Sequence, residues 1–191
     1  MASGRGGGWW FSGTLVLLVA MLVGAAAAAS SGNGNQAPKS PLRGAVDPAT
    51  RFLLGQALSG ALARLEEPAC RAVFADFSDG TGRALDRVLE ESGHTGRAYL
   101  GLLFFTDGAG HPHCEGGVVG AFTVPGSRVV RVCPVAVRRL SRQDPALVEA
   151  LLIHELLHAL GLHENPPTPD EIDARVESRC LARRHADQSA R

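Results

Sequence analysis

Apolar and polar positions divide the chain into three regions. No charged residue occurs between Trp9 and Ala29, and residues 30–45 are rich in Ser, Gly, Asn and Pro without any apolar period. After residue 45, apolar residues recur at spacings typical of helices and strands. We therefore expect one folded domain over residues 46–187, preceded by a flexible leader over residues 30–45.

Four helices are predicted by apolar residues that share one face and by signals at the helix ends. The first runs from Asp47-Pro48 to about Glu66, and the second covers residues 84–92 and ends at Gly93. The third lies between Asp144-Pro145 and Gly161, and the fourth follows the capping box Thr168-Pro169-Asp170-Glu171.

Three strands are predicted between the second and third helices. Residues 97–106 form a nearly continuous apolar run, which indicates a buried strand. Residues 118–123 and 128–133 flank Pro125-Gly126-Ser127, a pattern typical of a hairpin. Residues 69–77 are apolar without a clear period, so a short helix and a strand stay open there. The elements together predict an α+β fold.

The start of the chain has the pattern of a secretory signal peptide over residues 1–29. Arg5 precedes the apolar residues 15–23, and the small residues Ala25–Ala29 follow them. We therefore expect a secreted or periplasmic protein with no stable membrane association after cleavage. The alternative is an uncleaved anchor, because the apolar stretch approaches the length that spans a bilayer.

Composition and charge exclude two classes of protein. The chain is 45% apolar and 20% charged, which is not typical of a disordered protein. Nineteen basic residues balance nineteen acidic ones, and removal of Arg5 with the signal leaves a net charge of −1. A general nucleic-acid binder needs a strong positive excess, so we expect no nucleic-acid partner.

The four cysteines are expected to form two disulfides in an exported chain. Three pairings are possible. We favour Cys114–Cys133, which would link residues within the sheet region, and Cys70–Cys180, which would tie the last helix to the first.

The third predicted helix carries the candidate chemistry. It is apolar nearly all round, yet His154, Glu155 and His158 fall within one sector of about 100°. Buried imidazoles and carboxylates are costly unless something satisfies them. Two histidines four residues apart can bind one zinc ion from the same face, with Glu155 beside them to take a proton from water. The alternative is a pair of core histidines without a metal.

The segment His154-Glu155-Leu156-Leu157-His158 resembles the active-site helix of the zincin metallopeptidases. The similarity covers residues 144–173. It implies that His154 and His158 bind Zn²⁺, that Glu155 is the general base, and that the substrate is a peptide or protein. It also implies a small mixed sheet, supplied by strands within residues 98–133, with one edge strand lining the substrate cleft.

The third zinc ligand is predicted from spacing. Gly161 stands where metzincins have a glycine, and Glu164 stands at their ligand position, one residue after His163. We favour Glu164 as the ligand, with His163 as the alternative. Glu171 or Asp173 from the next helix is also possible, although Glu171 fits a capping role and either could support a histidine. The chain after residue 29 has no methionine, so it lacks the Met turn of an ordinary metzincin.

The sequence therefore predicts an exported zinc metallopeptidase. The alternative is a non-catalytic binding module that zinc stabilises on a zincin scaffold, and hydrolysis of a non-peptide amide also stays open. The run His111-Pro112-His113-Cys114 looks like a further metal cluster, but a surface loop beside a disulfide is the favoured interpretation.

Overall fold

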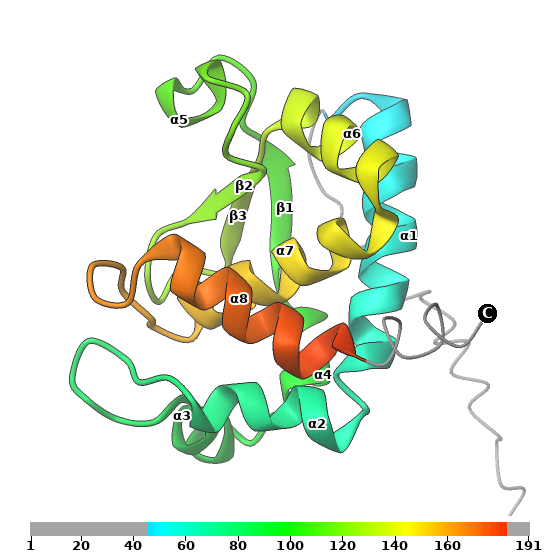
Figure 1. Cartoon of the computed structure of the whole chain (residues 1–191). Helices are drawn as coiled ribbons and strands as arrows, with labels where there is room; N and C mark the ends of the chain where they lie inside the picture. Colours follow the sequence, from blue (N-terminus) through cyan, green and yellow to red (C-terminus); the bar gives the residue numbers. More distant parts are fainter. Residues whose placement is uncertain (1–45, 183–191) are drawn as a thin grey trace, which may run out of the picture. The chain divides into compact units, whose positions relative to one another are not determined.

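The computed structural model describes residues 46–182, which form an α+β fold with eight α-helices and a three-stranded mixed sheet (Figure 1). The predicted signal peptide (1–29), the leader (30–45) and residues 183–187 lie outside the described residues. The elements in chain order are α1 Pro48–Arg64, α2 Pro68–Arg71, η1 Ala72–Ala75, α3 Leu85–Ser92, α4 Gly96–Leu100, β1 Phe104–Asp107, α5 Pro112–Glu115, β2 Ala121–Thr123, β3 Val129–Val132, α6 Pro134–Gln143, α7 Pro145–Ala159 and α8 Pro169–Cys180.

The four predicted helices are confirmed as α1, α3, α7 and α8, and their ends follow the expected chemistry. The Asp47 carboxylate accepts a hydrogen bond from the Thr50 amide at 3.0 Å, and Asp144 caps α7 in the same way. Gly93 ends α3 with φ +70°, a conformation that glycine adopts without strain. The capping box at the start of α8 is complete.

The predicted hairpin is confirmed as β2 and β3, which pair antiparallel. The prediction of one strand over residues 97–106 is wrong in its first half, because residues 96–100 form α4 and only Phe104–Asp107 forms β1. The Thr95 hydroxyl accepts a hydrogen bond from the Ala98 amide and so starts a helical turn. A continuous apolar run does not distinguish a buried strand from a buried helix.

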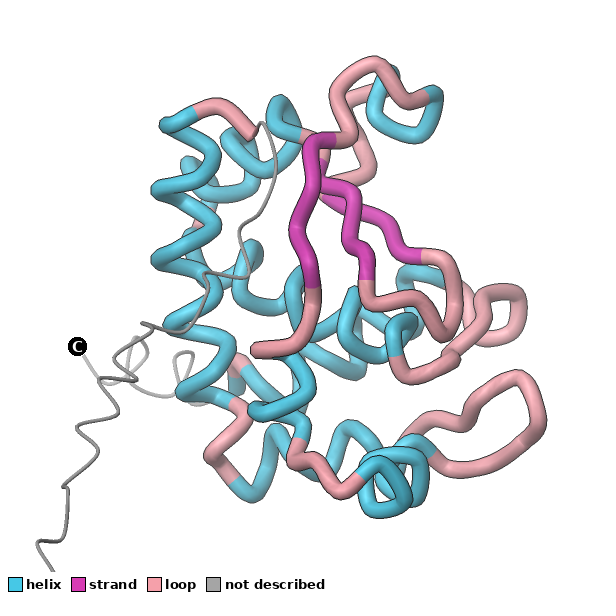
Figure 2. Tube along the Cα trace, turned by 180° about the vertical axis from the view of Figure 1, so that it is seen from behind, coloured by secondary structure: helices cyan, strands magenta, loops and turns pink. Residues whose placement is uncertain are grey.

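The sheet has the order β1-β3-β2, with β3 in the middle, parallel to the edge strand β1 and antiparallel to the edge strand β2. The helices cover one of its faces, and the view from behind shows the strands in front of them (Figure 2). Phe105, Val130 and Val132 point to the covered face and are fully buried or nearly so. Phe104 and Val129 alternate with them and are each 41% exposed.

Three short or unexpected elements complete the fold. The pattern left helix and strand open over residues 69–77, and residues 69–75 form the end of α2 and the 3-10 helix η1. Helix α6 was not predicted, and it packs against α7 and α1. The segment expected as a surface loop at His111–Cys114 includes the single helical turn α5.

Both favoured disulfides are confirmed, and all four cysteines are paired. Cys70–Cys180 joins α2 to the end of α8 across 110 residues, and Cys114–Cys133 joins α5 to the end of β3 across 19 residues. The first bridge holds α8 against the core, which fixes the helix that follows the candidate metal site.

Helix α7 lies at the centre of the described domain, packed by α1, α6 and α8. Its buried Glu149 forms an ion pair with Arg64 of α1, and Arg64 also donates to the Cys180 carbonyl of α8 at 2.6 Å. One arginine thus links three helices.

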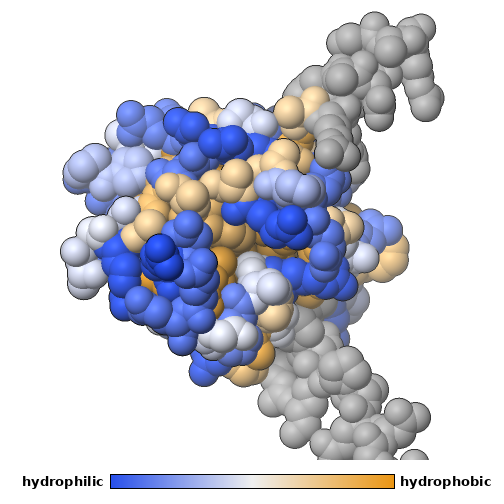
Figure 3. Space-filling model, turned by 90° about the horizontal axis from the view of Figure 1, so that it is seen from below, coloured by the Kyte–Doolittle hydropathy of each residue, from blue (hydrophilic) through white to orange (hydrophobic). Residues whose placement is uncertain are grey.

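The surface of the described residues differs from this apolar interior. Seen from below, it is largely hydrophilic, with apolar side chains gathered along a hollow at its centre (Figure 3). None of the helices between residues 46 and 182 combines the length and apolarity needed to cross a membrane.

Candidate metal centre

Helix α7 buries all three polar residues of the predicted motif. His154, Glu155 and His158 are 7%, 2% and 4% exposed, and the apolar residues around them are almost fully enclosed. The helix can be apolar on every side because other elements surround it. The polar sector that it keeps is therefore the exception that needs a physical explanation.

Each histidine is oriented by a hydrogen bond at Nδ1. His154 Nδ1 lies 2.7 Å from Asp173 Oδ1, and His158 Nδ1 lies 2.8 Å from the Leu162 carbonyl oxygen. A carbonyl oxygen and a carboxylate oxygen both accept, so both Nδ1 atoms donate. This arrangement leaves Nε2 of each ring as the atom available to a metal.

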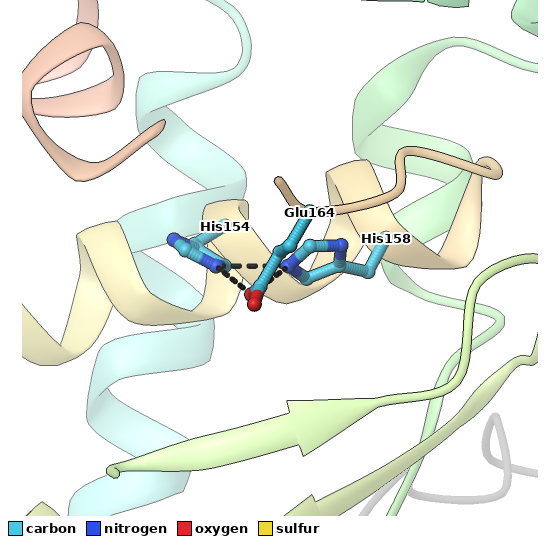
Figure 4. A group of neighbouring side chains, drawn as sticks. All are labelled: His154, His158 and Glu164. Atoms are coloured by element: carbon cyan, nitrogen blue, oxygen red, sulfur yellow. Dashed lines mark hydrogen bonds and ion pairs between the residues drawn. The ribbon is translucent and has the colours of Figure 1, made fainter. Parts of the chain in front are cut away.

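The two Nε2 atoms face one another at 2.9 Å, and Glu164 approaches them from the loop after α7 (Figure 4). Glu164 Oε1 lies 3.2 Å from Nε2 of His158 and 3.9 Å from Nε2 of His154. Ligand atoms that share one tetrahedral zinc ion are about 3.3 Å apart at ordinary zinc–ligand distances. The three side chains thus supply a donor set that could hold a metal ion.

The pKa values of the two histidines are displaced in opposite directions. Burial opposes the charge on His154, but the hydrogen bond to Asp173 and the nearby carboxylates together raise its pKa. Burial lowers the pKa of His158, against the effect of the Leu162 carbonyl. Because both Nδ1 atoms donate to other partners, the 2.9 Å contact between the two Nε2 atoms requires a shared proton or a shared cation.

Glu155 is the most enclosed of the three. Burial raises its pKa to about 7, with His154 and the Thr123 hydroxyl acting in the opposite direction. Its Oε2 atom is buried and has no hydrogen-bond partner among residues 46–182. A buried carboxyl with a raised pKa and an unsatisfied oxygen is suited to exchange protons near neutral pH.

The backbone after α7 delivers Glu164 to the histidines. Gly161 adopts φ +108°, which an L residue rarely does, and this turns the chain back over the helix end. The Leu162 carbonyl is thereby placed for His158, two residues before Glu164. Asn165 then adopts φ +65° and donates its amide to the Pro167 carbonyl at 2.7 Å.

The structure does not bring the alternative third ligands into this cluster. His163 is exposed and lies against Gly80, where an added Cβ would be 2.8 Å from its Nε2 atom. Glu171 accepts from the Thr168 amide at 2.8 Å, and this capping lowers its pKa. Both residues line a separate cavity of about 950 Å³ between the 76–80 loop and α8. Asp173 instead contacts the ring of His154. This is the supporting role for a histidine that the sequence left open for Asp173.

His111 and His113 lie away from this cluster. Their rings stack with centroids 5.0 Å apart, both rest on Phe122 of β2, and His111 Nδ1 accepts from the His113 amide at 3.3 Å. This pair sits beside the Cys114–Cys133 disulfide, in agreement with the favoured interpretation of a surface segment.

Sequence reasoning missed one residue beside the site, Thr123. It lies in the edge strand β2, and its buried hydroxyl is near enough to lower the pKa of Glu155. A threonine in a strand is ordinary, so only the pairing of β2 with β3 and its packing on α7 identify it.

Comparisons with protein-family models, curated proteins and solved structures found no match for this chain, so the inference of function rests on its own residues and geometry.

Proposed function

We propose that this protein is an exported zinc metallopeptidase with a zincin-like active site. The single observation that carries the proposal is the cluster of His154, His158 and Glu164 beside the buried, unsatisfied carboxyl of Glu155. Two of these residues are imidazoles whose free nitrogens point at each other, which is unfavourable without a shared cation or proton. The two disulfides support export.

His154, His158 and Glu164 would hold the ion, and Asp173 and the Leu162 carbonyl would fix the rings that bind it. When bound, zinc supplies Lewis-acid chemistry that polarises a scissile carbonyl and acidifies water. Glu155 takes the proton of the attacking water and later passes it to the leaving amine.

The edge strand β2 supports a peptide as the substrate. Its pairing with β3 leaves the other edge without a partner strand among residues 46–182, and its last residue faces α7. An extended peptide can add to such an edge through backbone hydrogen bonds. The resemblance to zincins likewise implies that one edge strand lines the substrate cleft.

The test begins with the chain after residue 29, purified without a chelator. We expect about one zinc ion per chain and cleavage of a mixed peptide library, both measured by mass spectrometry. Glu155→Gln should keep its zinc and lose at least about 100-fold in kcat/KM, because it removes the base but no ligand. Glu177→Gln, an exposed change on α8, is the matched control and should leave both values unchanged.

Each contrary outcome has a distinct meaning. Full zinc occupancy without cleavage of any peptide would support a zinc-stabilised binding module instead of a peptidase. Retained activity in Glu155→Gln would remove Glu155 as the base. A protein without zinc that regains none on titration would refute the metal centre.

A further inference from the structure

The described residues contain two buried side-chain oxygens that lack a hydrogen-bond partner, Thr123 Oγ1 and Glu155 Oε2. Buried polar atoms without partners cost free energy, and native proteins keep few of them. The two atoms belong to β2 and α7, which pack against each other. Their occurrence at one place, beside the candidate metal ligands, requires a reason.

Strand pairing determines where the Thr123 side chain points. Thr123 lies directly opposite Val130 in the antiparallel ladder, and Ala121 lies opposite Val132. Directly opposed residues project to the same face of a sheet, and both valines are fully buried on the face covered by helices. The Thr123 hydroxyl therefore projects towards α7, where Glu155 is located.

The strand is also held in place relative to α7. The Gly126 amide, in the turn that follows β2, donates to the His158 carbonyl at 2.9 Å. This bond joins the β2–β3 turn to the helix one turn beyond Glu155. A side chain at the end of β2 can thus act on Glu155 from a fixed position.

We propose that Thr123 is a positioning residue for Glu155, whose hydroxyl is a hydrogen-bond partner that holds the Glu155 carboxyl group in place. This inference rests on the proposed peptidase function. A hydroxyl donates to a carboxylate and accepts from a carboxylic acid, so rotation about its C–O bond serves either form. The transferred proton passes from water to Glu155 and then to the leaving amine, and Thr123 neither gains nor loses a proton.

The structure shows no tight hydrogen bond between the Thr123 hydroxyl and Glu155, and this agrees with the proposed role. Catalytic hydrogen bonds in ligand-free proteins are often long and shorten only when substrate is bound. Valine, with the same branched shape, would lack the hydroxyl, and alanine would lack both the hydroxyl and the methyl group. Serine alone would keep the hydroxyl without the methyl.

The experiment compares these three variants in the zinc-loaded protein, with the peptide found above as substrate. We expect Thr123→Val to lower kcat by about 10-fold to 100-fold with KM changed by less than about threefold, and zinc content unchanged. Thr123→Ser should recover most of kcat, whereas Thr123→Ala should not. Thr106→Val on β1 is the matched control, because its hydroxyl bonds to the Val130 carbonyl, and it should keep kcat. Unchanged kcat in Thr123→Val, or serine no better than alanine, would overturn the proposal.

A second measurement needs no turnover and separates this inference from the proposed function. Unfolding of the metal-free wild type, Thr123→Val, Glu155→Gln and the double variant forms a double-mutant cycle. We expect the change in the unfolding equilibrium constant of the double variant to differ by at least about fivefold from the product of the changes in the two single variants. If the two single-variant effects simply multiply, the proposal for Thr123 is overturned, even if the wild type is an active peptidase. If the effects depart from multiplicativity but the wild type cleaves no peptide, only the peptidase function is refuted.

Discussion

In the metal-free protein, Glu155→Gln should gain stability relative to the wild type as pH rises from 4 to 8.5. Folding raises the pKa of Glu155 from 4.5 to about 7, because the carboxyl is almost completely buried. Between these two values the unfolded chain has released the proton and the folded chain has not. The free energy of unfolding therefore falls as pH rises through this window.

The size of this stability change follows from the difference in the pKa of Glu155 between the folded and unfolded chain. Each pKa unit corresponds to about 1.4 kcal/mol, so a rise from 4.5 to about 7 lowers the stability of the wild type by about 3 kcal/mol above pH 7. Glutamine does not titrate. The difference in stability between Glu155→Gln and wild type should therefore shift by about 3 kcal/mol in favour of the variant between pH 4 and pH 8.5.

The assay is urea unfolding of chelator-treated protein followed by far-ultraviolet circular dichroism, since the chain after residue 29 has no tryptophan. Any free-energy cost of burying the glutamine amide is the same at every pH, so it cancels when the stability difference between variant and wild type is compared across pH. Glu177→Gln, on the exposed face of α8, serves as the control and should follow the wild type. A constant difference between Glu155→Gln and wild type over this range would refute the reasoning.

Two further predictions concern the ligand histidines and the disulfides. Asp173→Asn should weaken zinc binding by about 10-fold to 100-fold in a competition titration, because it changes the partner of His154 Nδ1, while the exposed Asp170→Asn should not. Replacing both cysteines of one disulfide by alanine should lower the free energy of unfolding by about 4.8 kcal/mol for Cys70–Cys180 and by about 3.2 kcal/mol for Cys114–Cys133. These values follow from the closed loops of 110 and 19 residues. Urea midpoints in the reverse order would contradict the chain-entropy account.

The helices were predictable where the sequence carried local signals. Asp47, Asp144 and Thr168 each precede a proline at the first helical position, and each side chain accepts a hydrogen bond from the new helix. Such signals need no knowledge of the rest of the chain. Helix α4 was misassigned because its cap, Thr95, stands before an apolar run that also fits a strand.

The candidate site was predictable to the extent that it is local. The i, i+4 spacing places His154 and His158 on one face of any helix, so their proximity needs no tertiary information. The position of Glu164 depends on the turn that the chain makes at Gly161, which its residue type signalled, and on the path of the loop that follows, which it did not. Thr123 approaches through strand pairing, which no local pattern specifies.

The three candidate ligands are not equally constrained, and this difference has a chemical use. His154 and His158 are buried and are each held by a hydrogen bond at Nδ1. The Glu164 side chain is 39% exposed, and the ion pairs of its carboxylate within residues 46–182 are those with the two histidines. A site with two fixed ligands and one on an exposed loop is preorganised and still open on one side. In the proposed peptidase, zinc, water and substrate would enter past Glu164 without unfolding α7, which the packing of α1, α6 and α8 around that helix would oppose.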